Sequence, residues 1–505
     1  MEKLNKVFST TQIPAIDRYT IEHEPINSLD LMERASHEWC VNFFKKFSDL
    51  FPVVVMAGYG NNGGDGYAIA RILKQSGCKV IVYQLETGAS PTSDCEMNRI
   101  RWKKEGGKIL TIQFPEDFKL EPEAIVIDAI FGSGLNRKIT GMLAEVIRKL
   151  NVLENVVVAV DIPSGLMGED NTGNDPSAII RADYTFTFQF PKLSFFLPEN
   201  ACYVGEWRVL DIGLHPTVLE ETPTDWYYTT AEVVSRLLPR PGKFDHKGTN
   251  GRGLLIAGSY GMMGAAVLAA RAAVRSGIGL LYCHVPHRGG DIMQIAVPEA
   301  VLDIDISPHY FSAEKNDRDY EAVAVGPALG RAPETVSALK KLLLQRRQKT
   351  IIDADALNIL AEYPELLDCL HRECLLTPHV KEFERLAGKS ANDFDRLNKL
   401  SIFAGRYHVY IVLKGAHSVV ATPEGKLYFN MSGNPGMAKG GAGDVLTGVL
   451  LGLAAGPLDI LSVARIGVYV HGLAGDMAVV DHGCRGISAG MITEALGKAW
   501  KKLEK

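Results

Sequence analysis

The residues best suited to chemistry lie in a glycine-rich stretch near the C-terminus, residues 434–448, which reads NPGMAKGGAGDVLTG. An Asn-Pro turn opens it, and Asp444 comes directly before an apolar run over 445–455 that is typical of a buried helix. Glycines before a helix leave backbone N–H groups free to bind an anion, and the helix N-terminus adds about half a positive charge. The stretch therefore predicts a phosphate site, although Asp444 alone is also compatible with a simple helix N-cap.

A second glycine-rich stretch, GYGNNGGDG at 58–66, follows an apolar strand pattern in the first half of the chain. Its GxGxxG spacing, with Glu86 after the next strand, raises the possibility of a dinucleotide fingerprint. Asp65 argues against that, because its charge would oppose a pyrophosphate at the helix opening. Asn61, Asn62 and Asp65 together suit a sugar or a cation better.

Two further expected strands of this half end in carboxylates that precede glycine-rich loops. Asp128 opens DAIFGSGL, and Asp161 opens DIPSGL, which also contains Ser164. Ligands of open α/β sheets bind at the carboxyl ends of the strands. We therefore expect Asn62, Asp128, Asp161 and Ser164 to converge on one crevice, although each alone is more often a turn residue.

The second half carries an ordered series of loops at expected strand ends. After GSYGMMG at 258–264, which lacks the Lys-Ser/Thr ending of a P-loop NTPase, come GPALG (326–330), DADALN (353–358), TPHVKE (377–382) and KGAHS (414–418). Lys414 is placed to meet a nucleotide phosphate. His379 is a candidate substrate contact or an ordinary loop histidine. Asp353 and Asp355 suit Mg²⁺ bound through water, or helix capping.

The length and composition of the chain exclude several classes of function. A chain of 505 residues is expected to form two or three domains, and 54 basic against 59 acidic residues give no electrostatic footprint for nucleic acid or an anionic membrane. The eight scattered cysteines indicate reduced thiols in a cytoplasm, and the uncharged run 445–458 is too short to span a bilayer. We expect a cytoplasmic protein with neither of those partners.

Strands and helices must alternate to position these loops. Apolar patterns predict strands at 52–57, 79–85, 124–128, 156–161, 184–190 and 207–212, with helices at 67–75, 95–105 and 141–150. After a Pro- and Thr-rich break at 215–225, strands are expected at 253–257, 279–285, 322–326, 350–353, 374–377 and 409–414, a hairpin over 418–430, and helices at 265–275, 333–347 and after Asp444. Near-continuous Val and Ile runs predict two doubly wound α/β domains with parallel sheets. Residues 13–44 are expected to be helical, with Asp30 as a possible cap, and to serve packing or oligomerisation.

Taken in this order, the motifs over nearly the whole chain resemble those of the bifunctional NAD(P)H-hydrate repair enzymes. NNGGDG, DAIFGSG and DIPSGL resemble the epimerase motifs, and GSYGMMGAA, GPALG, DADALN, TPHVKEFERL, VLKGAHS and NPGMAKGGAGDVLTG resemble the dehydratase series. The resemblance implies an epimerase domain at 1–222 with a Rossmann-like three-layer sandwich, and a ribokinase-like dehydratase domain at 223–505. We also expect the protein to form a homo-oligomer.

The resemblance also implies site residues. In the epimerase, K⁺ would be bound by Asn62, Asp128 and Ser164, and the hydrated cofactor by Asn61, Asn62, Gly63, Gly64, Asp65, Gly132, Ser133, Gly134, Leu135, Asn136, Arg137, Lys138 and Asp161. In the dehydratase, substrate would contact Ala265, Gly330, His379 and Asp444, and ADP or ATP with Mg²⁺ would contact Lys414, Gly415, Ala416, His417, Ser418 and Gly443.

The implied chemistry removes the hydroxyl that hydration adds at C6 of the nicotinamide ring of NADHX or NADPHX. Asp444 would accept the hydroxyl proton as the oxygen attacks a nucleotide phosphate, and Asp161 would act as acid or base in interconverting the R and S hydrates. Two other functions stay open on sequence alone. One is a small-molecule kinase with a regulatory first domain, and the other is a nucleotide-sensing scaffold.

Overall fold

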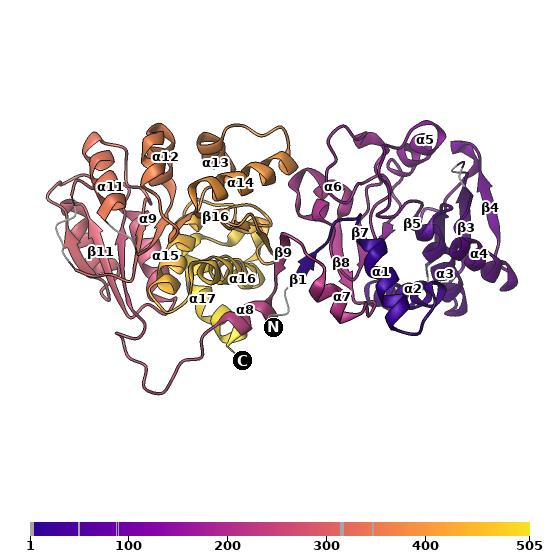
Figure 1. Cartoon of the computed structure of the whole chain (residues 1–505), viewed down its shortest axis with the longest axis horizontal. Coiled ribbons are helices and arrows are strands. Elements are labelled where there is room, and N and C mark those ends of the chain that lie inside the picture. The colour runs from indigo at the N-terminus through magenta and orange to yellow at the C-terminus, as the bar shows by residue number, and fades with distance from the viewer. Residues whose placement is uncertain are drawn as a thin grey trace. The chain divides into compact units, whose positions relative to one another are not determined.

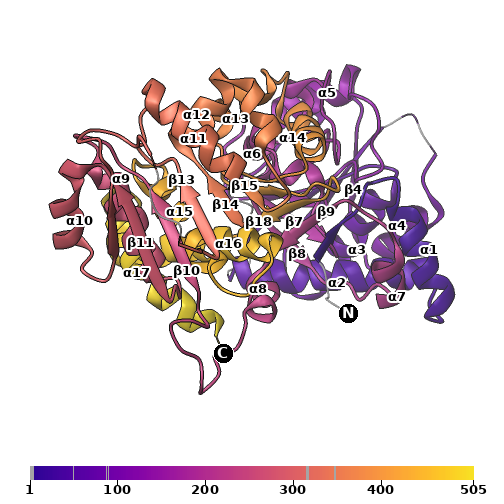
Figure 2. The same ribbon diagram turned by 60° about the vertical axis from the view of Figure 1, so that its left-hand side comes forward.

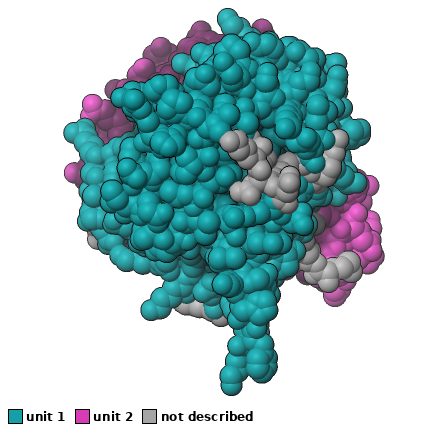
Figure 3. Space-filling view, turned by 90° about the vertical axis from the view of Figure 1, so that its left-hand side faces the viewer, with its two compact units in different colours: residues 1–5, 225–391, 395–505 teal, residues 6–224, 392–394 magenta. Residues whose placement is uncertain are grey.

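The computed structural model describes residues 5–48, 51–86, 88, 90–313, 318–345 and 348–504. The chain divides into two compact units, coloured in Figure 3. The smaller unit contains Lys6–Thr224 and Asn392–Phe394, and the larger contains Met1–Asn5, Asp225–Ala391 and Asp395–Lys505. Each unit is built on its own sheet. The last two residues of the helix expected at 333–347 lie outside the described ranges.

The smaller unit has seven strands, and every neighbouring pair is parallel. Their spatial order is β4 (Ile109–Ile112), β3 (Val80–Leu85), β2 (Val53–Ala57), β5 (Ile125–Ala129), β6 (Val157–Val160), β7 (Tyr184–Phe188) and β8 (Glu206–Leu210). The order reverses at β2, as in doubly wound sheets, which confirms the predicted α/β class. The apolar patterns did not predict β4, whose middle residues are exposed.

Helices cover both faces of this sheet because apolar side chains of its strands point alternately to either side (Figure 1). Val53 and Val55 pack with α2 (Ser28–Lys46), α3 (Asn61–Gln75) and α4 (Ser93–Lys104). Val54 and Met56 pack with α5 (Gly141–Leu150) on the other face. The expected N-terminal helix is split into α1 (Ile13–His23) and α2. The cap of α2 is Asn27, whose Oδ1 accepts the Asp30 N–H at 2.9 Å, so the prediction of Asp30 as the cap is wrong.

The larger unit is organised around a sheet to which its own residues contribute ten described strands. Their order is β9 (Trp226–Thr229), β18 (Leu427–Asn430), β17 (Val419–Ala421), β16 (Tyr410–Leu413), β15 (Cys374–Leu376), β14 (Lys349–Ile352), β13 (Ala322–Val325), β10 (Arg252–Ile256), β11 (Leu280–Val285) and β12 (Val301–Ile304). All pairs from β16 to β12 are parallel, whereas β17 runs antiparallel to both of its neighbours and forms the expected hairpin with β18.

Two helical layers enclose this sheet. On one face α9 (Met263–Val274), α15 (Ala442–Ala454), α16 (Ile460–Gly486) and α17 (Ala489–Leu503) share one apolar core. On the other side lie α11 (Pro333–Gln345), α12 (Ala354–Glu362) and α13 (Val380–Ala387) (Figures 1 and 2). Helices α9 and α15 approach so closely that a Cβ added to Gly448 would lie 2.0 Å from the Ala269 carbonyl oxygen.

Helix α16 is, within the described ranges, the one helix long and apolar enough to cross a membrane. Its apolar window is 78% buried, and it packs between α15 and α17. Those contacts are the ones expected of the central helix of a packed domain. Near its C-terminal end the helix is interrupted at Gly483, where φ is 71° and the backbone leaves the helical conformation.

Candidate active sites at the carboxyl edges of the two sheets

Four neighbouring strands of the smaller unit, β2, β5, β6 and β7, deliver polar residues to one edge of the sheet. Asn62 follows β2, Asp128 lies in β5, and Asp161 directly follows β6. Because these strands are parallel and adjacent, their carboxyl ends meet at one edge. Helix α3 begins at Asn61, not at the expected residue 67, so NNGGDG forms its first turns. Gly63 permits this start, since a Cβ there would lie 2.1 Å from the Gly58 carbonyl oxygen.

A dense hydrogen-bond network joins the predicted cation ligands. Asp128 Oδ2 accepts the Ser164 N–H at 2.7 Å, and Oδ1 accepts the Ser164 hydroxyl at 2.5 Å. The Ser164 Oγ in turn accepts the Phe131 N–H at 2.8 Å, and Asn62 Nδ2 donates to the Phe131 carbonyl at 3.0 Å. An added Cβ on Gly132 would lie 3.2 Å from the Asn62 Cβ. The structure therefore brings Asn62, Asp128 and Ser164 together and places the start of the 132–138 loop against them.

Asp128 is a fully buried carboxylate, and it has no ion-pair partner among the described side chains. Burial raises its pKa to about 6, although hydrogen bonds from Ser164 and from the Ile130 N–H oppose the rise. No group of three or more His, Cys, Asp or Glu within the described ranges is arranged to hold a metal. The donors here are instead mixed oxygens with one formal charge, a set suited to a weakly charged, hard cation.

Asp161 is held in a strained and heavily bonded position. Its φ of 65° lies in the left-handed region, which is costly for a non-glycine residue and is characteristic of functional sites. Its Oδ1 accepts three hydrogen bonds: from Lys192 Nζ at 2.6 Å, from Thr187 Oγ1 at 3.1 Å and from the Phe188 N–H at 3.1 Å. Lys192 is only 1% exposed. The sequence motifs did not point to this lysine, although it follows β7, the next strand of the same edge.

Two more carboxylates face Asp161. Burial, and then the charge of Asp161, raises the pKa of Asp65 on α3 well above its ordinary value. The same two causes, in the same order, raise the pKa of Asp17 on α1 to about 6, and Lys192 opposes that rise. A pyrophosphate would meet three carboxylates here, which supports the argument from Asp65 against an ordinary dinucleotide fingerprint. No sequence signal marks Asp17, which lies in an amphipathic helix.

The predicted residues of the larger unit lie at the carboxyl edge of five consecutive strands, β16, β15, β14, β13 and β10. These are Lys414 after β16, His379 after β15, Asp353 and Asp355 after β14, Gly330 after β13, and Ala265 in the first turn of α9 after β10. The parallel arrangement brings the corresponding loops to one edge, as the sequence predicts.

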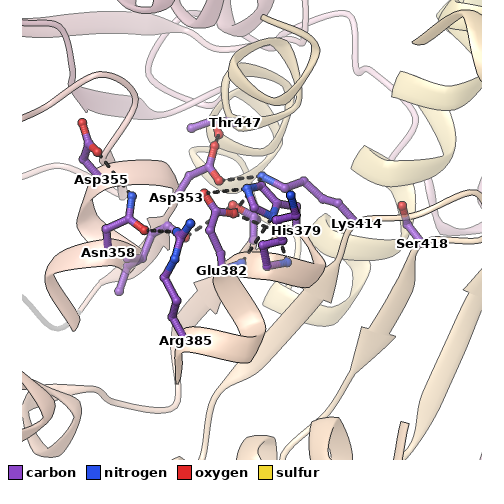
Figure 4. A network of polar contacts seen from close by, with 12 residues as sticks. Asp353, Asp355, Asn358, His379, Glu382, Arg385, Lys414, Ser418 and Thr447 are labelled. Atoms are coloured by element: carbon purple, nitrogen blue, oxygen red, sulfur yellow. Dashed lines mark hydrogen bonds and ion pairs between the residues drawn. The ribbon is translucent and has the colours of Figure 1, made fainter. Parts of the chain in front are cut away.

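Lys414 and Asp353 form the centre of the polar network in Figure 4. Lys414 Nζ donates to Asp353 Oδ1 at 2.8 Å, and Asp353 Oδ2 accepts the Thr447 hydroxyl of α15 at 2.7 Å. Burial would lower the pKa of Lys414, but the charge and hydrogen bond of Asp353, with the charges of further carboxylates, outweigh that effect and raise the pKa above its ordinary value. Asp353 occupies the N-cap position of α12, but its side chain makes no capping bond there and instead serves as the counter-ion of Lys414.

Asp444 lies in the first turn of α15, close to this pair. The N-cap of the helix is Gly441, with φ of 90°, and no side chain makes a capping bond there, so the N-cap interpretation of Asp444 is wrong. Burial raises the pKa of Asp444 to about 6, Asp353 adds to the rise, and Lys414 opposes it. A Cβ on Gly443 would lie 3.6 Å from Lys414 Nζ. The ammonium and the amides at the helix N-terminus therefore form one positive region beside a carboxylate that titrates near neutrality.

The other predicted residues are fixed by local bonds. His379 caps α13, and its Nδ1 accepts the backbone N–H groups of Lys381 and Glu382 at 3.1 and 3.3 Å. Asp355 Oδ2 accepts the Gly330 N–H at 2.9 Å, which ties two of the strand-end loops together. The His379 side chain keeps 48% of its surface exposed, so it remains able to meet a ligand.

The KGAHS loop is held by its own side chains. Ser418 Oγ accepts the Gly415 N–H at 3.2 Å, and His417 Nδ1 lies 2.9 Å from the Asn430 carbonyl, where burial lowers the pKa of the imidazole. Figure 4 shows Ser418 lying apart from the Asp353–Lys414 pair. Gly415 and Ala416 are exposed. The loop thus offers an exposed backbone beside the Lys414 ammonium.

Comparison with known proteins assigns each unit to a family. The NAD(P)H-hydrate dehydratase family matches residues 253–498, and the family described as YjeF-related protein N-terminus matches residues 28–194. The bifunctional NAD(P)H-hydrate repair enzyme of Moorella thermoacetica is 34% identical over 98% of this chain and 97% of its own length. The enzyme of that name from Escherichia coli is also 34% identical, over 86% of this chain and 82% of its own length.

A solved structure agrees with this assignment for the larger unit. The ADP/ATP-dependent NAD(P)H-hydrate dehydratase of Bacillus subtilis, co-crystallised with ATP and Mg²⁺, is 32% identical and aligns with a TM-score of 0.50. The alignment covers 55% of this chain and 98% of the Bacillus chain. The larger unit therefore shares the fold of that dehydratase. The two family matches, the full-length relatives and the two strand-edge sites place the chain in the family of bifunctional NAD(P)H-hydrate repair enzymes, which combine an epimerase with a nucleotide-dependent dehydratase.

Proposed function

We propose that the two activities of the family are divided at the boundary between the units, with the epimerase at residues 1–222 and the dehydratase at 223–505. A cut at 222 keeps β9 with the larger unit, where it pairs with β18 along four residues. Asp161 and Asp444, the two candidate acid/base residues, then belong to separate domains. A substitution can therefore remove either residue without altering the other domain.

In the dehydratase we propose that Asp444 is the general base. The observation that carries this assignment is the position of Asp444: a half-buried carboxylate with a pKa of about 6 beside the Lys414 ammonium and the N-terminus of α15. Asp444 accepts the proton of the C6 hydroxyl, and the oxygen attacks the terminal phosphate of ADP or ATP. Lys414 and the backbone amides at 441–443 stabilise the charge of the transferred group. Loss of phosphate and of the C5 proton then restores NADH or NADPH, leaving AMP when ADP is the donor.

The substrate contacts proposed for this site are Ala265, Gly330, His379 and Asp444, and the nucleotide contacts are Lys414, Gly415, Ala416, His417, Ser418 and Gly443. Mg²⁺ would accompany the nucleotide phosphates, as in the Bacillus crystals with ATP and Mg²⁺. The Asp353 and Asp355 oxygens are already engaged by Lys414, Thr447, Gly330 and Asn358. They would therefore reach the ion through water.

In the epimerase we propose that Asp161 moves the proton of the C6 hydroxyl during interconversion of the R and S hydrates. Residues 61–65 and 132–138 would hold the hydrated cofactor. K⁺ would be bound by Asn62, Asp128 and Ser164, where it would supply positive charge beside the buried Asp128 carboxylate and would hold the surrounding loops in place. The stereospecific dehydratase can then consume both epimers.

We also propose a cytoplasmic homo-oligomer. The eight cysteines are free, as expected for a reducing compartment. Exposed apolar side chains occur at the end of the larger sheet, on α10 (Gly290–Ala296), on β12 and directly after β12: Ile292, Ile295, Val301, Ile304 and Ile306. Light scattering of the purified chain tests the assembly, since a monomer at all concentrations would contradict it.

The direct test of function uses chemically hydrated NADH and NADPH. Each hydrate is incubated with the full chain and ADP, ATP or no nucleotide, while the near-ultraviolet absorbance of the reduced cofactor and the release of phosphate are followed. The proposal expects absorbance to return only with a nucleotide, with one phosphate released for each cofactor restored. Phosphoryl transfer to a sugar or vitamin, with no recovery of NADH, would instead identify a small-molecule kinase.

A further inference from the structure

Lys192 is a buried cation in the smaller unit for which the proposed epimerase reaction has no role so far. It follows β7 and is 1% exposed, and its Nζ donates to Asp161 Oδ1 at 2.6 Å, Thr187 Oγ1 at 2.9 Å and the Phe190 carbonyl at 3.4 Å. Its three hydrogens therefore have three acceptors. A lysine is rarely buried this completely, and it is retained only where its charge and donors are matched.

The bonds around Asp161 are one-sided. Lys192, Thr187 and the Phe188 N–H all bond to Oδ1, whereas no described group bonds to Oδ2. The Asp161 side chain is 12% exposed, so the carboxylate is held at one oxygen and open at the other. This arrangement fixes the side-chain rotamer and aims the free oxygen, and the left-handed backbone at Asp161 gives a second constraint on the same direction.

The local charge balance shows why a cation is needed. The charge of Asp161 acts on Asp17 of α1 and on Asp65 of α3, and Asp17 and Asp94 of α4 also act on Asp65. Lys192 pairs with Asp161 and opposes the effect on Asp17. Neighbouring carboxylates disfavour one another's charged forms, and a nearby cation opposes that effect. Among the described ion pairs, Lys192 joins Asp161 and neither Asp17 nor Asp65.

We propose that Lys192 is a positioning residue of the epimerase: its ammonium pairs with Oδ1 of Asp161, rather than with Asp17 or Asp65, and directs the free Oδ2 toward the substrate hydroxyl. As the C6 hydroxyl gives its proton to Oδ2, the C6–N1 bond of the hydrate breaks with its electron pair on N1, and C6 becomes an aldehyde carbon. N1 then attacks the other face of that carbon and re-forms the bond, the proton returns from Oδ2 to the oxygen, and the carboxylate ends as it began. Lys192 keeps its three hydrogens throughout. This inference rests on the proposed role of Asp161.

The test compares Lys192→Met and Lys192→Gln, which remove the charge, with Lys192→Arg, which keeps it, all in the full chain. The epimerisation kcat and KM are measured against pH, and the dehydratase of the other unit reports on the integrity of each preparation. We expect both neutral variants to lose about 10²-fold in kcat with little change in KM. Their activity should begin to rise only at higher pH than in the wild type, because a carboxylate without its cation holds a proton more tightly. Lys192→Arg should keep the wild-type pH profile.

Lys149→Met is the matched control, because Lys149 is a partly buried lysine of α5 whose Nζ donates to the Phe118 carbonyl at 3.0 Å, away from Asp161. It should lower thermal stability without moving the pH profile. If Lys192→Met does not fold, Lys192→Gln decides, since it retains donors for Asp161. A neutral variant that keeps the wild-type pH profile, whatever its rate, overturns the proposal. Wild-type epimerisation by Asp161→Asn would overturn the role of Asp161 itself, whereas an inactive Asp161→Asn beside an unaffected Lys192→Met overturns only the role of Lys192.

Discussion

Replacing Asp444 by Asn separates its chemical role from any structural one. Asn has nearly the same size, and the N-cap of α15 is Gly441, so no capping bond is lost. Folding should not suffer. The folded pKa of about 6 lies above the ordinary 3.8, so the stability linked to this group is present at low pH and lost as pH rises through about 6. Near neutrality Asn therefore replaces a carboxylate that is costly to ionise, and the melting temperature should stay equal or increase.

The rate should behave differently. Asn cannot accept the hydroxyl proton, so dehydration should slow by about 10² to 10⁴, which corresponds to about 3 to 5 kcal/mol of barrier. The wild-type rate should rise with pH around 6, where Asp444 loses its proton, and this inflection should vanish in Asp444→Asn. Single-turnover recovery of NADH absorbance from the S hydrate measures both effects, and epimerisation serves as the control. A variant within about threefold of the wild-type rate, or with the same inflection, would refute the role of Asp444 as base.

Three other perturbations test separate parts of the structure. Lys414→Met should weaken ADP and ATP binding and move the dehydration inflection above 6, because Lys414 holds the pKa of Asp444 down; an unmoved inflection would contradict the contact. K⁺ should raise the melting temperature of the wild type relative to a bulky organic cation but leave Asp128→Asn unchanged, and an equal effect on both would argue against the cation site. Gly448→Ala should destabilise the larger unit by about 1 to 3 kcal/mol or more, because the new Cβ would lie 2.0 Å from the Ala269 carbonyl oxygen; calorimetry with no loss would show that α9 and α15 can separate freely.

The fold and much of the site could be predicted from the sequence, because buried parallel strands have a clear apolar pattern and their arrangement determines where the loops that follow them lie. Continuous apolar runs such as VVVMA and IVIDA identify strands buried on both faces, and their carboxyl ends must meet at one edge. Asp128, Asp161 and Lys414 could therefore each be placed at such an edge without coordinates. Strands with exposed residues, such as β4 and β12, lack the apolar run and were missed.

Some site residues could not be predicted from the sequence, because only folding brings them close to the other residues of the site. Lys192 sits in an apolar segment, QFPKLSFF, whose lysine resembles a surface residue until β7 is seen beside β6. Asp17 comes from a helix more than a hundred residues away from Asp161, and nothing local marks it. The N-cap of α15 could not be predicted correctly either, because the helix begins at the backbone turn of Gly441 and not at the nearest acidic residue, Asp444.

The most direct test of two separable sites is the time course of a mixture of R and S hydrates with the full chain and saturating nucleotide. The wild type should restore all of the NADH in one rapid phase, because epimerisation keeps the S form supplied. Asp161→Asn should restore the S fraction at the wild-type rate and then continue only as fast as the R form converts spontaneously. A single rapid phase in Asp161→Asn, or loss of the rapid phase while the dehydratase unit remains folded, would contradict the assignment of epimerisation and dehydration to separate units.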